Sequence, residues 1–166
     1  TENPTNEMHI PSSYWMYVAG LEAGIGSATL IAQYIGNVTP DFQPLTPPML
    51  NGQMDQQSQI NFANALIDYQ NRHFNRQIFH QQEKSNHAAT LTAIQAFGYE
   101  AWQAEMTFYY NFTSDEWMVR PTLKWAVSDQ LSLTTGVQYL RGSSQTLFGY
   151  SSPVLNGAFA ELRIQF

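Results

Sequence analysis

The last nine residues of the chain alternate strictly between two kinds of side chain. One set is apolar: Ala158, Ala160, Leu162, Ile164 and Phe166. The other is mostly polar: Phe159, Glu161, Arg163 and Gln165. Successive side chains of a strand point to opposite faces of its sheet. Glu161 and Arg163 therefore fall in mid-strand, where a soluble core would exclude them. The pattern predicts a strand with lipid on one face and water on the other.

Period-two segments of this kind recur along the chain between turn residues. They predict seven strands, at residues 14–23, 28–37, 88–97, 101–112, 117–126, 130–141 and 155–166. Tight turns at 24–26, 98–100 and 128–129 alternate with long connections at 38–87 and 142–153 and a short one at 113–116. The expected fold class is all-β, an antiparallel up-and-down transmembrane β-barrel with about seven or eight strands in this chain and one long helical loop.

Composition agrees with this expectation. Charged residues make up 12% of the chain, against roughly 25% in typical soluble domains. Aromatic residues reach 14%, yet the mean hydropathy is −0.32 and no apolar run is long enough for a spanning helix. Alternating strands produce this combination, because polar and apolar faces cancel in any window average. The net charge of −6 argues against nucleic acid as a partner.

The aromatic residues are predicted to form two girdles at the strand ends, as membrane interfaces favour. Trp102, Trp125 and Phe166 fall at the end with the tight turns. The larger set falls at the opposite end: Trp15, Tyr17, Tyr110, Phe112, Trp117 and Tyr139.

The terminal strand resembles the C-terminal targeting signal of Gram-negative outer-membrane β-barrels, which ends in Phe with hydrophobic residues at alternating positions before it. Leu162, Ile164 and Phe166 carry the resemblance. Residues 136–142 and 146–149, with the terminal strand, are similar to the C-terminal ends of porin-like families, although Ser143, Ser144 and Ser151 stand where acidic residues are expected. The resemblance implies a bacterial outer-membrane location, with membrane lipids and the barrel-assembly machinery as partners.

Counting back from a periplasmic Phe166 places the long connections outside the cell and the tight turns in the periplasm. Seven strands then put residue 1 on the extracellular side, whereas complete bacterial single-chain barrels have an even strand number. The favoured explanation is that residues 1–166 are the C-terminal part of a larger barrel, whose N-terminal part would be a partner. The alternative is a single complete barrel domain with an eighth strand at Glu7–Ser12, which is short for a membrane span.

The connection at 39–87 is expected to hold an amphipathic helix within 54–84. Ile60, Ala63, Ile67, Phe74 and Ile78 recur near helical spacing, and Asp55 lies in the first turn. The loop is expected outside the cell or in the lumen. Residues 76–81 are an alternative extension of the third strand.

Six charged side chains are predicted to face the lumen: Glu22, Glu105, Arg120, Lys124, Glu161 and Arg163. Opposed acidic and basic side chains across a wet lumen would select solutes by charge. They would equally serve as salt bridges that only satisfy the interior.

The sequence favours neither catalysis nor a metal or cofactor. The zero cysteine count excludes disulfides and thiolate sites. His73, His80 and His87 are seven residues apart, too far for two of them to share one ion directly on a helix. Ser85, Asn86, His87 and Asp115 could lie near the outer rim of an outer-membrane hydrolase, but no spacing defines a triad.

Two classes of function follow. The first is a porin-like channel for the passive passage of small polar or charged solutes. The second is a structural barrel that sheathes or anchors a partner protein of an outer-membrane complex for electron transfer or export. A soluble ligand-binding barrel is less favoured, because it would turn its apolar face inward and does not explain two aromatic girdles.

Overall fold

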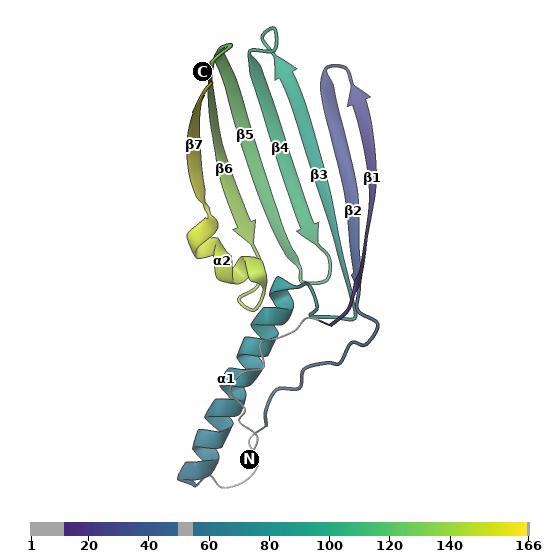
Figure 1. Cartoon of the computed structure of the whole chain (residues 1–166), viewed down its shortest axis with the longest axis vertical. Helices are drawn as coiled ribbons and strands as arrows, with labels where there is room; N and C mark the ends of the chain where they lie inside the picture. Colours follow the sequence, from purple (N-terminus) through teal and green to yellow (C-terminus); the bar gives the residue numbers. More distant parts are fainter. Residues whose placement is uncertain (1–11, 50–54, 166) are drawn as a thin grey trace. The chain divides into compact units, whose positions relative to one another are not determined.

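A computed structural model describes residues 12–49 and 55–165. Seven strands form one mostly antiparallel sheet in chain order (Figure 1). They are β1 (Trp15–Ile25), β2 (Ala28–Val38), β3 (Ser85–Phe97), β4 (Trp102–Asn111), β5 (Glu116–Ser128), β6 (Leu131–Arg141) and β7 (Gly157–Ile164). Helix α1 (Gln56–Ile78) lies in the β2–β3 connection and α2 (Leu147–Leu155) in the β6–β7 connection. The prediction of an antiparallel, mostly β fold is confirmed.

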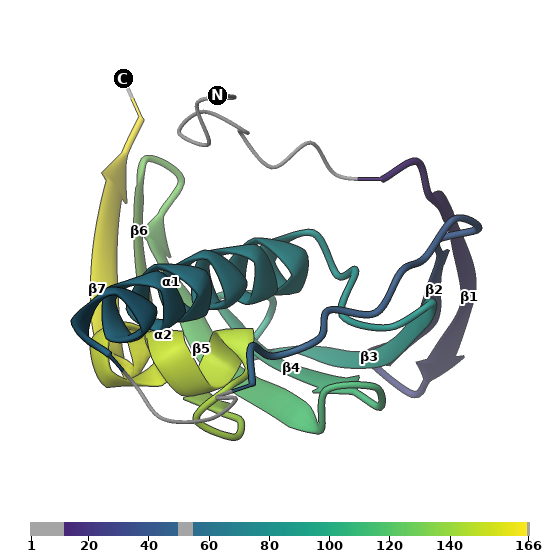
Figure 2. The same ribbon diagram turned by 90° about the horizontal axis from the view of Figure 1, so that it is seen from below.

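The sheet is curved across its strands but is not closed (Figure 2). β1 and β7 are its two edges, and within the described residues neither pairs with the other. The predicted closed barrel is therefore not formed by these seven strands alone. The candidate eighth strand at Glu7–Ser12 and the terminal Phe166 lie outside the described residues, apart from Ser12.

Three short turns join β1 to β2, β3 to β4 and β5 to β6, at the same edge of the sheet. The β3–β4 turn places Gly98, Tyr99 and Glu100 at positive φ, between 56° and 68°. The prediction of a loop at 142–153 is wrong in part, because this connection contains α2. The last strand accordingly begins at Gly157 and not at residue 155.

The chain divides into two compact units, and each is described by itself. The first comprises residues up to Trp15 together with Asn37–Asn86, and the second Met16–Gly36 together with His87–Phe166. In the first unit α1 lies within the predicted range 54–84. The alternative strand extension over 76–81 is wrong, because Phe79 N donates to Asn75 O and Gln81 N to Arg76 O in the final helical turns. No helix among the described residues is long and apolar enough to cross a membrane.

Asp55 caps the N-terminus of α1, where its side chain accepts a hydrogen bond of 2.8 Å from Ser58 N. Hydrogen bonding from the Ser58 side chain, and after it from the Ser58 backbone N–H, lowers the pKa of Asp55 below its ordinary value. A depressed carboxyl pKa stabilises the folded form above the unfolded pKa, and this contribution is lost as the pH falls through the folded pKa. We expect Asp55→Ala at neutral pH, or acidification of the wild type, to lower the protection factor of the Ser58 amide against hydrogen exchange, taken relative to the intrinsic rate at the same pH, while the protection factors of amides beyond Leu66 remain unchanged.

The second unit has two chemically different faces, which the strand register defines. We call polar face the side of the sheet that carries Arg120, and apolar face the opposite side. Among the described residues of this unit the only buried hydrophobic side chains are Ala88 and Leu140, and three polar or charged residues are buried as well: Asn111, Glu116 and Thr146. The apolar face exposes large side chains on every strand, such as Leu21, Tyr34, Leu91, Phe108, Leu123, Val137 and Leu162. This distribution is the inverse of a soluble core.

Candidate functional site

The polar face collects the six charged residues that the sequence predicted for a lumen. Glu105 of β4 is opposite Thr122 of β5, which is opposite Gly136 of β6 and then Phe159 of β7. The next row toward the tight turns carries Gln103, Lys124, Thr134 and Glu161. Ser132 and Arg163 follow in the row after that. Glu22 of β1 shares the parity of Gly20, whose added Cβ would lie 3.6 Å from Gln33 Cγ on this face.

These charges do not form pairs. In the described part of the chain, no ion pair within 4.0 Å joins Glu105, Glu161 or Glu22 to Arg120, Lys124 or Arg163. An ion pair of 3.0 Å instead joins Arg72 to Asp68, both on the exposed surface of α1. The alternative in which the six charges serve as mutual salt bridges is therefore not supported by the geometry. The charged side chains remain available to solvent or solute.

Arg120 is instead held by an aromatic ring. Its Cζ lies 5.1 Å from the centroid of the Phe159 ring. Phe159 belongs to β7, and β6 lies between it and β5. Gly136 of β6 makes this contact possible, because a Cβ there would lie 2.6 Å from Phe159 Cζ and 2.8 Å from Thr122 Cγ2. The alternation of the sequence predicts Arg120 on this face but does not indicate that Gly136 and Phe159 support it.

Helix α2 covers the polar face at the end away from the tight turns. Glu116, at the start of β5, is 1% exposed. Its Oε2 accepts from Phe148 N at 2.8 Å, and its Oε1 accepts from Ser114 Oγ at 2.7 Å. Thr146 Oγ1 accepts from Gly149 N in the same first turn of α2. Glu116 and Thr146 together satisfy two amides that helix geometry leaves without partners.

The far end of α2 is also fixed to the sheet. Leu140 N donates to Asn156 Oδ1 at 2.6 Å, and Asn156 Nδ2 donates to Leu140 O at 3.2 Å. The Asn156 side chain thus replaces a strand partner beyond the last β6–β7 pair. In the first turn of α2, the Phe148 ring also lies 5.6 Å from the Tyr109 ring of β4. Sequence analysis identified neither Glu116 nor Asn156.

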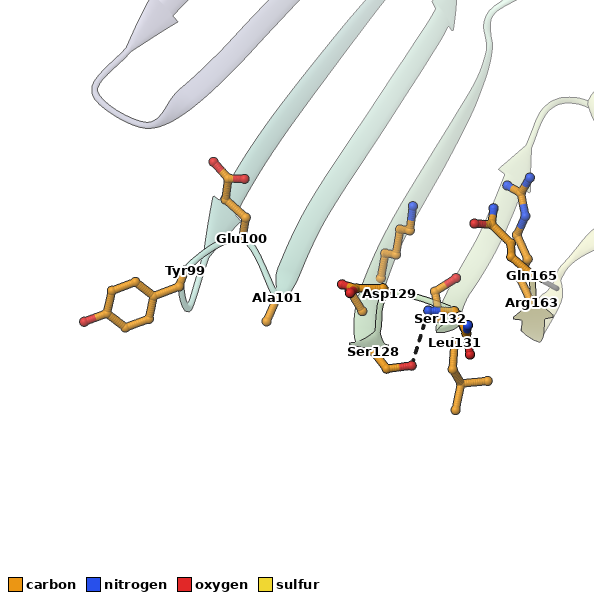
Figure 3. Close-up of a pocket in the computed structure, with 12 residues that line it drawn as sticks. Tyr99, Glu100, Ala101, Ser128, Asp129, Leu131, Ser132, Arg163 and Gln165 are labelled. Carbon is orange, nitrogen blue, oxygen red and sulfur yellow. Dashed lines mark hydrogen bonds between the residues drawn. The ribbon is translucent and has the colours of Figure 1, made fainter.

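At the tight-turn end the polar side chains line an open cavity of about 440 Å³ (Figure 3). Lys124, Arg163, Glu100 and Asp129 contribute charges of both signs to its lining. In the β5–β6 turn Gln130 N donates to Ser128 Oγ at 3.3 Å. Tyr99 projects away from the other labelled side chains in Figure 3 and is fully exposed.

Rings gather at both ends of the apolar face, where the sequence predicted two girdles. At the tight-turn end Trp102 and Trp125 stack at 5.0 Å with an interplanar angle of 1°, and Phe97 stacks on Trp102. At the other end Trp117 contacts Tyr139 and Phe108, and Tyr110 contacts Phe112. Tyr17 contacts Tyr34 at that end too, and Trp15 is 76% exposed. Leu162 and Ile164 are exposed on the same face.

The histidines have separate surroundings. His73 of α1 stacks on Tyr69, and its Nε2 lies 3.1 Å from Gln77 Nε2. His87 of β3 stacks on Tyr34 and its Nδ1 lies 2.9 Å from Tyr34 Oη. Among residues 12–49 and 55–165, no three His, Asp or Glu side chains converge in a way that could hold a metal ion. In the same ranges no hydrogen bond joins the His87 side chain to Ser85, Asn86 or Asp115, the residues considered for a hydrolase.

No protein-family model, curated protein or solved structure matches the chain.

Proposed function

We propose that this chain contributes seven strands to a transmembrane β-barrel of the bacterial outer membrane, and that its polar face lines a passage for small polar solutes. One observation carries the proposal: the burial pattern is inverted, with exposed apolar side chains along the whole apolar face. Soluble monomers rarely expose contiguous apolar patches beyond a few hundred Å². Lipid would cover this surface in a bilayer, while water would solvate the unpaired charges on the other face.

The ends of the strands support the same proposal. Short turns lie at one edge of the sheet, and the connections that carry α1 and α2 arise at the other. Short periplasmic turns and longer extracellular loops are typical of outer-membrane barrels. The stacked pair of Trp102 and Trp125 and the cluster around Trp117 would lie at the two membrane interfaces.

The two open edges of the sheet determine how many further strands a closed barrel would need. Consecutive strands alternate in direction, so β1 and β7 run the same way, and antiparallel closure needs an odd number of further strands between them. The interior of an eight-stranded barrel is just wide enough for side chains or one small ligand. Since α2 packs on the polar face and a helix is roughly 10 Å wide, we propose more than eight strands in the complete barrel.

The test is ionic conductance of the full-length protein in planar lipid bilayers. We expect stepwise currents, because the polar face would border a water-filled lumen. Reversing both cations of β5, with Arg120→Glu and Lys124→Glu, should shift permeability toward cations, measured as a change in the sign of the reversal potential across a salt gradient.

One outcome would contradict the channel, and another would contradict the role of the two cations in its selectivity. The first is the absence of current both in the wild type and in a variant that lacks residues 54–84, with correct insertion shown by heat-modifiable mobility. That result would favour the structural alternative, a barrel whose polar face holds a partner protein. The second is an unchanged reversal potential after the double reversal, which would assign Arg120 and Lys124 a structural role.

A further inference from the structure

Arg120 has the properties of a ligand-binding cation and not of a structural one. It lies on the exposed part of the polar face, beyond the cover of α2. In the described ranges, no carboxylate lies within ion-pair distance of it. The Cζ atom of Arg120 lies over the Phe159 ring. A guanidinium has five N–H donors, and a cation–π contact does not use them as hydrogen-bond donors, so they remain available to bind an anion.

The surrounding residues keep this cation in place. Glu105 and Glu161 are the acidic residues of nearby rows, opposite Thr122 and Thr134 respectively, and a flexible Arg would be drawn to either of them. The Phe159 ring occupies the space that Gly136 leaves open on β6, and there it contacts the Arg120 guanidinium instead. A mid-strand glycine and a lumen-facing phenylalanine thus serve to orient one positive charge. Gly in a strand interior weakens the strand and marks a close approach of this kind.

We infer that Arg120, positioned by Phe159, binds the carboxylate group of a small monoanionic solute. The inference rests on the proposed function and names its substrate class. A planar carboxylate matches the edge of a guanidinium with two parallel hydrogen bonds. A phosphate dianion would need a second cation. The next one on the strand, Lys124, is four residues away, or roughly 13 Å along a strand. The carboxylates of Glu105 and Glu161 also repel multiply charged anions.

Binding is measured directly, so that the result does not depend on conductance. The probe is ¹³C-labelled acetate, titrated against the full-length protein in detergent micelles and followed by line broadening in ¹³C NMR. We expect Arg120→Gln to weaken acetate binding about tenfold, and Arg120→Lys to weaken it less, because an ammonium keeps the charge without the planar fork. Phe159→Leu keeps every charge and should still weaken binding about threefold, since the guanidinium loses its support.

Two comparisons make the result specific. Arg141→Gln removes a cation at the end of β6, opposite Trp117 and outside the polar face, and should leave acetate binding unchanged. Inorganic phosphate at the same concentration should bind more weakly than acetate. Equal binding by wild type, Arg120→Gln and Phe159→Leu would overturn the site, and tighter binding of phosphate would overturn the carboxylate assignment. Acetate binding that depends on Arg120 in a protein without conductance would support the site and contradict the channel.

Discussion

Replacing Glu116 with alanine should release α2 from the sheet and lower the free energy of unfolding by about 3 kcal/mol, the range of a hydrogen bond to a buried charged group. The carboxylate is buried and accepts from Phe148 N and Ser114 Oγ. Alanine leaves both donors without this acceptor. The Phe148 amide belongs to the first turn of α2, where no acceptor within the helix is available.

Amide hydrogen exchange shows which residues lose protection when α2 is released. In Glu116→Ala the amides of residues 147–155 should exchange faster, while those of β3 and β4 stay protected. Glu116→Gln retains an acceptor oxygen for Phe148 N and should lose less than about 1 kcal/mol. Glu83→Ala removes an exposed carboxylate and is the control for net charge. Unchanged exchange across α2 in Glu116→Ala would mean that Asn156 and the Tyr109–Phe148 contact hold the helix without Glu116.

The strands could be predicted from sequence because their period-two pattern is clear over most of each strand. β4 and β5 were expected at 101–112 and 117–126 and are found at Trp102–Asn111 and Glu116–Ser128. The pattern is broken in β3, where the register places Ile94 opposite Glu105 on the polar face and Gln95 opposite Ala104 on the apolar face. Alternation is a local property, and neighbouring strands joined by short turns inherit their register from it.

Helix α2 could not be predicted, because its stability is not local. It has nine residues, with Gly149 and Pro153 among them, and such a short segment is not helical by itself. The helix is held by Glu116, which lies thirty-two residues before Phe148, and by Asn156. Gly149 allows the close approach, since a Cβ there would lie within 1.7 Å of Ser143 O. The pattern Thr146-x-x-Gly149 is the only part of this site that a sequence could signal, as an N-cap.

The contact of Arg120 with Phe159 could not be predicted from the sequence, for a related reason. Alternation placed Arg120 and Phe159 on the same face, but their contact spans two strands and depends on the absence of a side chain at Gly136. The sequence does contain a usable signal, a glycine in the middle of a regular strand. Its meaning becomes clear only when the register sets Gly136 between Thr122 and Phe159.

Replacing Leu91 with arginine should lower the free energy of unfolding from a lipid bilayer by about 2–4 kcal/mol, the cost of a cation on the lipid side of a barrel near the midplane. Leu91 is the middle residue of β3, faces the apolar side opposite Phe108, and is 48% exposed. In a water-soluble protein a residue this exposed tolerates arginine within about 0.5 kcal/mol. Urea unfolding of the protein in lipid vesicles, followed by tryptophan fluorescence, measures the difference.

Ile94→Arg is the matched variant, three residues along the same strand but on the polar face. Its side chain is half-buried and lies opposite Glu105, so a new arginine would meet a carboxylate in a wet lumen and change stability by less than about 1 kcal/mol. A membrane fold and a soluble fold thus predict opposite orders of tolerance to arginine at these two positions. If lipid covers the apolar face, the exposed Leu91 is the intolerant position and the half-buried Ile94 the tolerant one. A soluble fold reverses that order, and finding it reversed would remove the basis for the membrane proposal.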